Sequence, residues 1–229
     1  MPMELAPLKR KLALTKTRIA SLDVHQGWLD GRSVVAIVTG MGTALAAEHL
    51  VRLLDAMDID RVVVVGITGA VDDETAIGTL ILPERVVDGA SGAQYRPDRL
   101  GQGAPRGTMW TSDGLITDPA VIAELRSDGV VSLDMETAAI AGVCEHRGIP
   151  WSVFRCISDR ATDGSVDEEL FGLSRPDGTP DAKAVVAHVA RHPGRIPGLF
   201  RMARQAKLAT ELAAASAIEA VADGPQGRR

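Results

Sequence analysis

Two short runs of aliphatic residues constrain the fold of this chain most strongly. Ser33–Thr39 (SVVAIVT) and Arg61–Thr68 (RVVVVGIT) are rich in valine and are bounded by Gly or Asp. Unbroken apolar runs of this length predict strands that are buried on both faces, as in a sheet covered by helices. Between them, Thr43–Met57 has apolar residues at helical spacing, with Thr43 as its expected N-cap. Strand, Gly turn, helix and strand form a βαβ unit, so we expect the two strands to be parallel.

The rest of the chain continues this alternation of strands and helices. It predicts an α/β sandwich that forms a single domain over residues 1–222, followed by a frayed tail at 223–229. We expect residues 88–108 to form a loop. The remaining elements expected from the sequence are strands at Gly78–Val87 (interrupted by Pro83), Val130–Leu133 and Trp151–Ile157, and helices at Asp118–Arg126, Glu136–His146 and Ala182–Ala222 (broken at His192–Pro197).

Composition excludes several classes of function. The formal net charge of −5 gives no reason to expect a nucleic acid partner. The two cysteines, Cys144 and Cys156, are too few for a disulfide framework, so we expect both to be buried small hydrophobes in a reducing compartment. No apolar stretch approaches the roughly 20 residues that a membrane span needs. We therefore expect a soluble, cytoplasmic protein without a membrane partner.

Three of the expected strands end in segments that could bind a ligand. Ligands of α/β sheets gather at the carboxyl ends of strands, and here those ends carry Gly40–Thr43, Gly66–Ala70 and Ser158–Asp159. The glycines of Gly40–Thr43 would let backbone N–H groups approach an anion or a sugar at a helix N-terminus. A tight turn that needs glycine for its dihedral angles explains the same residues equally well.

Two carboxylates have both a structural and a chemical interpretation. Glu136 stands at a helix start, where an acidic residue is usually a cap or a partner of the helix dipole, although its two oxygens could also bind a ribose diol. Asp159 follows a strand as either a loop cap or a catalytic acid, and the second role would need a raised pKa. The local sequence around each residue does not decide between its structural and its chemical interpretation.

The histidines show no pairing that indicates a metal site. His25, His49, His146, His188 and His192 are scattered over expected helices and loops, and we expect all five to be structural or exposed. We expect no metal ligand set.

Taken together, the motifs resemble the nucleoside phosphorylase/nucleosidase superfamily, in particular its 5′-methylthioadenosine/S-adenosylhomocysteine nucleosidase-like branch. The most specific segment is Leu133–Asp159 (LDMETAAIAGVCEHRGIPWSVFRCISD), and TGMGTALAA, VVVVGITGAV and TSDGLITD support it. The resemblance covers residues 1–159. It implies a three-layer αβα sandwich with a mixed, mostly parallel central sheet, and a homodimer or higher homo-oligomer.

The resemblance also implies a role for each site residue. Asp159 would protonate purine N7 as the base departs, and Ser158 would orient it. Glu136 would grip the ribose 2′- and 3′-hydroxyls, with Met135 packed beside the sugar. Glu4 would activate the attacking water.

Further substrate contacts follow from the same resemblance. The backbone of Leu115 and Ile116 would read the edge of the base. Gly42 belongs to the turn beside the sugar, and Ile67 occupies the position next to the nucleophile. Such a reaction passes through an oxocarbenium-like sugar that carboxylates stabilise, and it needs no metal or redox cofactor.

The identity of the nucleophile rests on residues near Ile67. Val64 and Val65 stand where phosphate-using relatives carry an arginine, and an apolar Ile67 cannot bind phosphate, so the sequence favours hydrolysis of 5′-modified adenosines. Phosphorolysis, action on futalosine or adenosylhopane, and a non-catalytic nucleoside-binding module remain the alternatives. Arg155, Arg160 and Arg96 are the possible phosphate ligands.

The family normally has a strand directly before the Met-x-x-Glu segment, with which this sequence opens. Either that strand lies upstream, or the chain lacks one edge of its site. The expected position of Glu4 in the site depends on which of these two holds.

Overall fold

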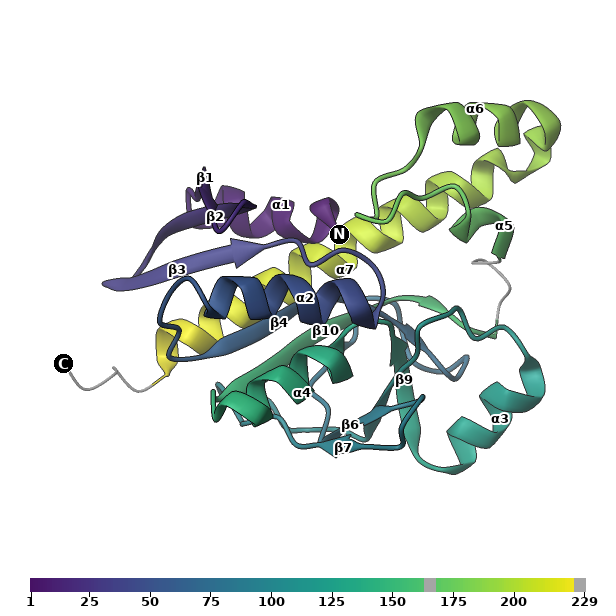
Figure 1. Ribbon diagram of the computed structural model, residues 1–229. Helices are drawn as coiled ribbons and strands as arrows, with labels where there is room; N and C mark the ends of the chain where they lie inside the picture. The colour runs from purple at the N-terminus through teal and green to yellow at the C-terminus, as the bar shows by residue number, and fades with distance from the viewer. Residues whose placement is uncertain (163–167, 225–229) are drawn as a thin grey trace.

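The structure, a computed structural model, describes residues 1–162 and 168–224. A seven-stranded mixed sheet with the strand order β5-β10-β4-β9-β8-β6-β7 forms its centre, and β1, β2 and β3 make a second, antiparallel sheet (Figure 1). The strands are β1 (Thr15–Ile19), β2 (Leu22–Leu29), β3 (Arg32–Ile37), β4 (Val62–Ala70), β5 (Leu80–Ile81), β6 (Arg85–Asp88), β7 (Gln94–Tyr95), β8 (Thr108–Thr111), β9 (Val130–Asp134) and β10 (Trp151–Arg160).

Helices cover both faces of the central sheet, which gives the expected three layers (Figure 1). Helix α4 lies against one face, and the long α7 runs along the other, against β10 and β4. The helices are α1 (Pro2–Lys11), α2 (Thr43–Leu54), α3 (Pro119–Ser127), α4 (Thr137–Arg147), α5 (Glu168–Phe171), α6 (Ala182–Arg191), the short 3-10 helix η1 (Pro193–Arg195) and α7 (Ile196–Asp223).

The longest strand pair, β4 with β10, lies in the sheet interior. These strands are parallel and pair over nine residue pairs, from Trp151 beside Val62 to Arg160 beside Ala70. Strands β6, β8 and β9 are also parallel. Each antiparallel pair of the central sheet spans only two residue pairs. The expectation of a mixed, mostly parallel sheet is therefore confirmed.

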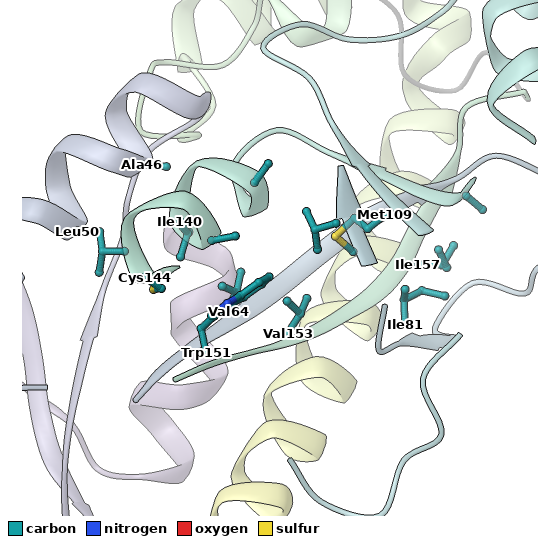
Figure 2. Close-up of a cluster of buried hydrophobic side chains, with 14 residues drawn as sticks. Ala46, Leu50, Val64, Ile81, Met109, Ile140, Cys144, Trp151, Val153 and Ile157 are labelled. Carbon is teal, nitrogen blue, oxygen red and sulfur yellow. The ribbon is translucent and has the colours of Figure 1, made fainter. Parts of the chain in front are cut away.

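Small side chains let both helical layers approach the sheet closely. On one face, α4 packs a row of small residues onto the strands, and the cluster includes Val64, Met109 and Val153 (Figure 2). On the other face, a row of alanines in α7 contacts Phe154 and Cys156 of β10. Close-packed interiors of this kind leave few voids.

Both cysteines are buried and unpaired, as expected. Burial raises the pKa of the Cys144 and Cys156 thiols to about 12, so both behave as small hydrophobes. Among the described residues, none of the helices has the length and apolarity that a bilayer crossing requires.

Several boundaries follow from residues that the sequence already marked. Asp118 caps α3, because its side chain accepts a hydrogen bond from the N–H of Ala120. Gly148 ends α4 in the left-handed conformation with φ of 65°. The helical C-terminal region breaks at η1, within the expected interval. Residues 225–229 of the expected frayed tail lie outside the described residues.

One expectation was wrong. The N-cap of α2 is Gly42, not Thr43, because the Thr43 N–H and hydroxyl bind Asp113 instead. Both strands of the expected βαβ unit form, as β3 and β4, but they are not neighbours in one sheet: β3 pairs with β2, and β4 pairs with β10.

The sequence analysis did not identify α1, β1, β2, β7 or β8. Strand β1 is mostly exposed and carries charged residues, and β7 and β8 are short, so their apolar patterns are weak. Their pairing depends on neighbours that the local sequence does not reveal.

Replacing Met109 with alanine should destabilise the protein by roughly 2–5 kcal/mol, because it removes a fully buried side chain from the main core and leaves a cavity. Urea unfolding would measure the loss. The matched control is Val121→Ala on α3, where the side chain is 40% exposed, and its change should stay within about 0.5 kcal/mol. Equal stability of the two variants would contradict the assigned core.

Candidate active site

A buried arginine holds three carboxylates together at one end of the central sheet. The Arg155 side chain is only 6% exposed, and its guanidinium lies 2.7 Å from Asp134, 3.2 Å from Glu136 and 3.3 Å from Glu4. Nη1 also donates to the carbonyl of Ile67 at 3.0 Å. A buried charge is tolerated only when it is paired and hydrogen-bonded, which explains why three carboxylates and a backbone carbonyl surround the Arg155 guanidinium.

The fold brings these groups together from distant parts of the sequence. Arg155 lies in β10, Asp134 ends β9, and Glu136 directly precedes α4. Glu4 comes from the first turn of α1, which contacts β4. Because β4 lies between β9 and β10 in the sheet, all four side chains meet over this strand.

Glu4 is fixed by the backbone of β4 as well as by Arg155. Its Oε1 accepts a hydrogen bond from the N–H of Ile67 at 2.9 Å, and its Oε2 contacts the amino group of Met1. A Cβ atom on Gly66 would lie 2.1 Å from Glu4 Oε1. The carboxylate can therefore approach this strand only because residue 66 is glycine.

Glu136 binds two donors, and neither belongs to its own helix. Its Oε1 accepts from the N–H of Gly42 at 3.2 Å, and its Oε2 accepts from Arg155. The pKa of Glu136 is raised to about 7: burial raises it most, Asp134 and Glu4 also raise it, and Arg155 and the Gly42 N–H lower it. Glu136 therefore changes its protonation state near neutral pH.

Asp134, which the sequence analysis did not single out, performs the capping role. Its Oδ2 accepts from the N–H of Thr137 at 3.0 Å, and its Oδ1 accepts from the Thr111 hydroxyl at 2.6 Å. Glu136 makes no side-chain cap hydrogen bond. Its carboxylate is thus available for another function, and the cap interpretation of Glu136 does not hold.

Asp159 and Ser158 lie at the carboxyl end of β10. The register with β4 shifts between Ile157 and Asp159, so that Asp159 pairs with Gly69. Such an irregularity redirects a side chain at the end of a strand. The Ser158 hydroxyl donates a hydrogen bond to Asp159 Oδ1. The two side chains are therefore in contact, and the role of Ser158 in orienting Asp159 stays a prediction.

The expected substrate-binding loop is tied to the glycine turn. Asp113 accepts from the N–H of Thr43 at 3.0 Å, which joins the segment of Leu115 to the N-terminus of α2. Ile116 packs against the small apolar cluster around Ile122. Met135 is partly buried between Asp134 and Glu136.

Ile67 takes part in the site through its backbone. Its N–H binds Glu4 and its carbonyl binds Arg155, whereas its side chain packs toward the alanines of α7. The sequence argument relied on an apolar side chain beside the nucleophile. That expectation was wrong, because the strand turns the Ile67 side chain toward the buried cluster formed by β10 and α7.

A cavity of about 690 Å³ reaches Glu4, Glu136 and Arg155. From these groups it extends between β3 and β4 and is lined mainly by aliphatic side chains. The carboxylate cluster lies at one end of this cavity, and polar residues at the start of β3 and before β4, including Arg32, Asp60 and Arg61, line its other end.

One cluster of titratable groups was missed by the sequence analysis. The Oε1 atom of Glu169 lies 2.9 Å from Nδ1 of His188 and 3.5 Å from Nε2 of His192. The spacing of four residues between His188 of α6 and His192, which directly follows this helix, was the available signal. Arg195, 3.6 Å from Glu169, already supplies a positive charge there.

Comparisons with known proteins show the family. The family model described as the phosphorylase superfamily matches residues 1–105 and 97–191. The chain belongs to this superfamily and to its 5′-methylthioadenosine/S-adenosylhomocysteine nucleosidase-like branch. The nucleosidase of that name from Anoxybacillus flavithermus is 30% identical over 75% of this chain and 88% of its own length. That of Haemophilus influenzae is 28% identical, over 69% and 82%.

Solved structures of this superfamily share the fold. A 5′-methylthioadenosine/S-adenosylhomocysteine nucleosidase from S. pneumoniae, in complex with a transition-state inhibitor, superposes with a TM-score of 0.71 at 20% identity, covering 96% of each chain. The futalosine hydrolase of Helicobacter pylori gives a TM-score of 0.72 at 13% identity, covering 96% of this chain and 94% of its own. At these identities the likeness shows the fold alone.

Glu136→Gln should change the pH dependence of stability. The folded pKa of about 7 lies above the unfolded value of 4.5, so the folded state holds this proton more tightly. The contribution of Glu136 to stability is present below pH 4.5 and is lost as pH rises through about 7. The loss is at most about 3 kcal/mol, and glutamine abolishes it.

Urea unfolding at pH 5 and pH 8 measures this effect. The variant should lose less stability than the unmodified protein between these two values. Glu124→Gln, at an exposed position on α3, is the control and should keep the unmodified pH dependence. Identical pH profiles for all three proteins would exclude the charge change at Glu136.

Proposed function

We propose that this chain hydrolyses the N-glycosidic bond of purine nucleosides, with 5′-modified adenosines such as 5′-methylthioadenosine and S-adenosylhomocysteine as substrates. Membership of the nucleosidase-like branch supports this reaction, because the relatives named above carry these two substrates in their names. The arrangement of three carboxylates around Arg155 supports the same reaction independently of the relatives.

One observation favours water over phosphate as the nucleophile. Arg155 is surrounded by Glu4, Asp134 and Glu136, so its positive charge is already matched by carboxylates. These partners raise the pKa of Arg155 above its usual value, against the opposing effect of burial. A phosphate dianion would be repelled by the same three groups, whereas an oxocarbenium-like sugar would be stabilised by them.

The proposed mechanism divides the work among three carboxyl groups. Glu136 binds the ribose hydroxyls, as its position beside the Gly42 turn allows. Asp159 donates a proton to purine N7, which makes the base a better leaving group as the C1′–N9 bond breaks. Glu4 accepts a proton from water as its oxygen bonds to C1′. The products are the neutral free base, which carries the donated proton on N7, and a sugar with a hydroxyl at C1′; Asp159 is left ionised and Glu4 protonated, and proton exchange with water restores both.

The remaining arginines give little support to phosphorolysis, the second candidate. Arg160 donates to the carbonyl of Thr75 at 3.2 Å. Arg96 is exposed, next to β7 at the edge of the sheet. Futalosine remains an alternative substrate, because a futalosine hydrolase shares the fold.

We further propose that the protein acts in the cytoplasm, in methionine salvage, as a homo-oligomer. Exposed apolar side chains support self-association: Phe200 of α7 is 71% exposed and Val186 of α6 is 69% exposed. Apolar residues so open to water are typical of interaction surfaces when they cluster.

A panel of nucleosides, assayed with and without phosphate, tests the function. We expect release of adenine from 5′-methylthioadenosine and S-adenosylhomocysteine at the same rate in both buffers, measured by chromatography of the free base. Dependence on phosphate together with a sugar 1-phosphate product would establish phosphorolysis instead. Binding without any product over long incubation would reduce the protein to a nucleoside-binding module.

Asp159→Asn should lower the turnover rate about 10²–10⁴-fold, because it removes the proton donor to the leaving base. Its circular dichroism spectrum should not change. The control is Asp128→Asn, an exposed residue that follows α3, which should keep full activity. Full turnover by the Asp159 variant would rule out its role as the acid.

A further inference from the structure

Two adjacent N–H groups at the start of α2 bind carboxylates from two different segments. The N–H of Gly42 donates to Glu136 at 3.2 Å, and the N–H of Thr43 donates to Asp113 at 3.0 Å. The Thr43 hydroxyl donates to the same Asp113 oxygen. The glycine turn of residues 40–43 therefore joins the carboxylate that we assign to the ribose with the loop that we expect to contact the base.

The two carboxylates occupy equivalent places in the central sheet. Strands β8 and β9 are parallel, and Thr111 of β8 pairs with Asp134 of β9. Asp113 lies two residues beyond Thr111, and Glu136 lies two residues beyond Asp134. The carboxyl ends of parallel neighbours lie at one edge of a sheet, where ligands of such sheets gather. Both side chains therefore leave this edge together and bind the same helix end.

Asp113 supplies a cap that α2 does not provide for itself. The first N–H groups of a helix have no partner within the helix, and a side chain of the preceding residue usually caps them. Here that residue is Gly42, whose φ of 91° favours glycine and which has no side chain to offer. The cap comes from a distant segment instead, so the start of α2 and the loop after β8 hold each other in place.

The loop after β8 depends on this contact. Within residues 1–162 and 168–224, Thr43 alone binds the exposed Asp113 carboxylate. The hydrogen bonds from the Thr43 hydroxyl and N–H lower the pKa of Asp113, so its carboxyl group is ionised at neutral pH. Hydrogen bonds to an ionised acceptor are stronger than those between neutral groups. The contact therefore fixes the segment that continues to Leu115 and Ile116.

The glycine turn is also fixed on the side away from Asp113. The N–H of Met41 donates to the carbonyl of Pro176 at 2.9 Å. Pro176 belongs to a closed turn, because Ser174 and Pro180 form an isolated β-bridge. The backbone position of Gly42, and with it the N–H that binds Glu136, is thus set by one partner before it and one partner after it.

We propose that Asp113 is a positioning residue for the nucleoside site. Through Thr43 it fixes the distance between Glu136 and the loop of residues 112–116, and the single C1′–N9 bond of a nucleoside requires one such distance between its sugar and its base. This inference rests on the proposed function and on the expected base contacts of that loop. Without Asp113 the loop would have to be ordered each time a nucleoside binds, which weakens binding.

Steady-state kinetics of the full chain with 5′-methylthioadenosine test this role. Asp113→Ala should raise KM about 10-fold, the value of one hydrogen bond of this kind. It should change kcat by less than about 3-fold, because the lost contact serves substrate and transition state alike. Asp113→Asn keeps an oxygen that accepts from Thr43 and should return KM to within about 3-fold of the unmodified value.

Asp118→Ala is the matched control. Asp118 is also an exposed aspartate that caps a helix, α3, and it lies only five residues further along the chain. Both alanine variants should lower Tm by a similar amount, about 2–4 °C, because each loses one helix cap. Only Asp113→Ala should raise KM.

Hydrogen exchange of the unliganded proteins provides a measurement that does not depend on catalysis. Asp113→Ala should accelerate exchange of the Gly42 N–H, which binds Glu136 and not Asp113, at least ~10-fold. Asp118→Ala should leave this exchange rate unchanged.

Each other outcome overturns the positioning role. Equal KM values of the two alanine variants would reduce Asp113 to a structural cap. A fall in kcat without a rise in KM would place its effect in the chemical step, and unchanged exchange at Gly42 would show that Asp113 does not fix the turn. If the unmodified chain releases no base, the proposed function fails, while exchange at Gly42 still decides whether Asp113 holds the turn in place.

Discussion

The burial of the Arg155 guanidinium is the constraint on which the site depends. A single charge inside a sheet that is covered on both faces must find compensation among its neighbours. Here it finds three carboxylates, from α1, β9 and the turn before α4, and one backbone carbonyl from β4. The same charge therefore ties together four segments that are far apart in the sequence and holds Glu4 and Glu136 on two nitrogens of one rigid group.

The charges of the cluster do not cancel, and this imbalance has a chemical use. The Arg155 guanidinium and the Met1 ammonium face three carboxylates, which leaves excess negative charge, and Glu136, whose pKa burial and the neighbouring carboxylates raise to about 7, relieves it by holding a proton below that pH. Binding of a sugar that develops positive charge would relieve the same imbalance. The excess negative charge of these carboxylates is thus complementary to the transition state of glycosidic cleavage and unfavourable for a phosphate nucleophile.

The parts of the fold that could be predicted are those with strong local signals. The valine runs form strands β3 and β4, and the Asp118 cap and the Gly148 terminus are present as expected, because each signal acts within a few residues. The residues of β3 are only partly buried, so the expected burial on both faces was wrong for this strand. Glu136 and Asp159 were identified through their motif. Arg155 was considered only as a phosphate ligand and Asp134 only as part of the helix start, because the importance of both residues lies in an ion pair across 21 residues of sequence. An arginine inside an apolar strand was the signal that a buried partner must exist.

Gly66 carries a consequence for how such a site can change. A Cβ atom there would overlap Glu4 Oε1 and would also lie 2.7 Å from Arg155 Nη1. A serine or threonine at this position, with a hydroxyl to hold an anion, would take the space of the carboxylate that we assign to water activation. The carboxylate that would activate water and a hydroxyl that would bind phosphate therefore cannot both occupy the small space next to the backbone of residue 66. A chain with this geometry can exchange one for the other only by altering residues 4 and 66 together.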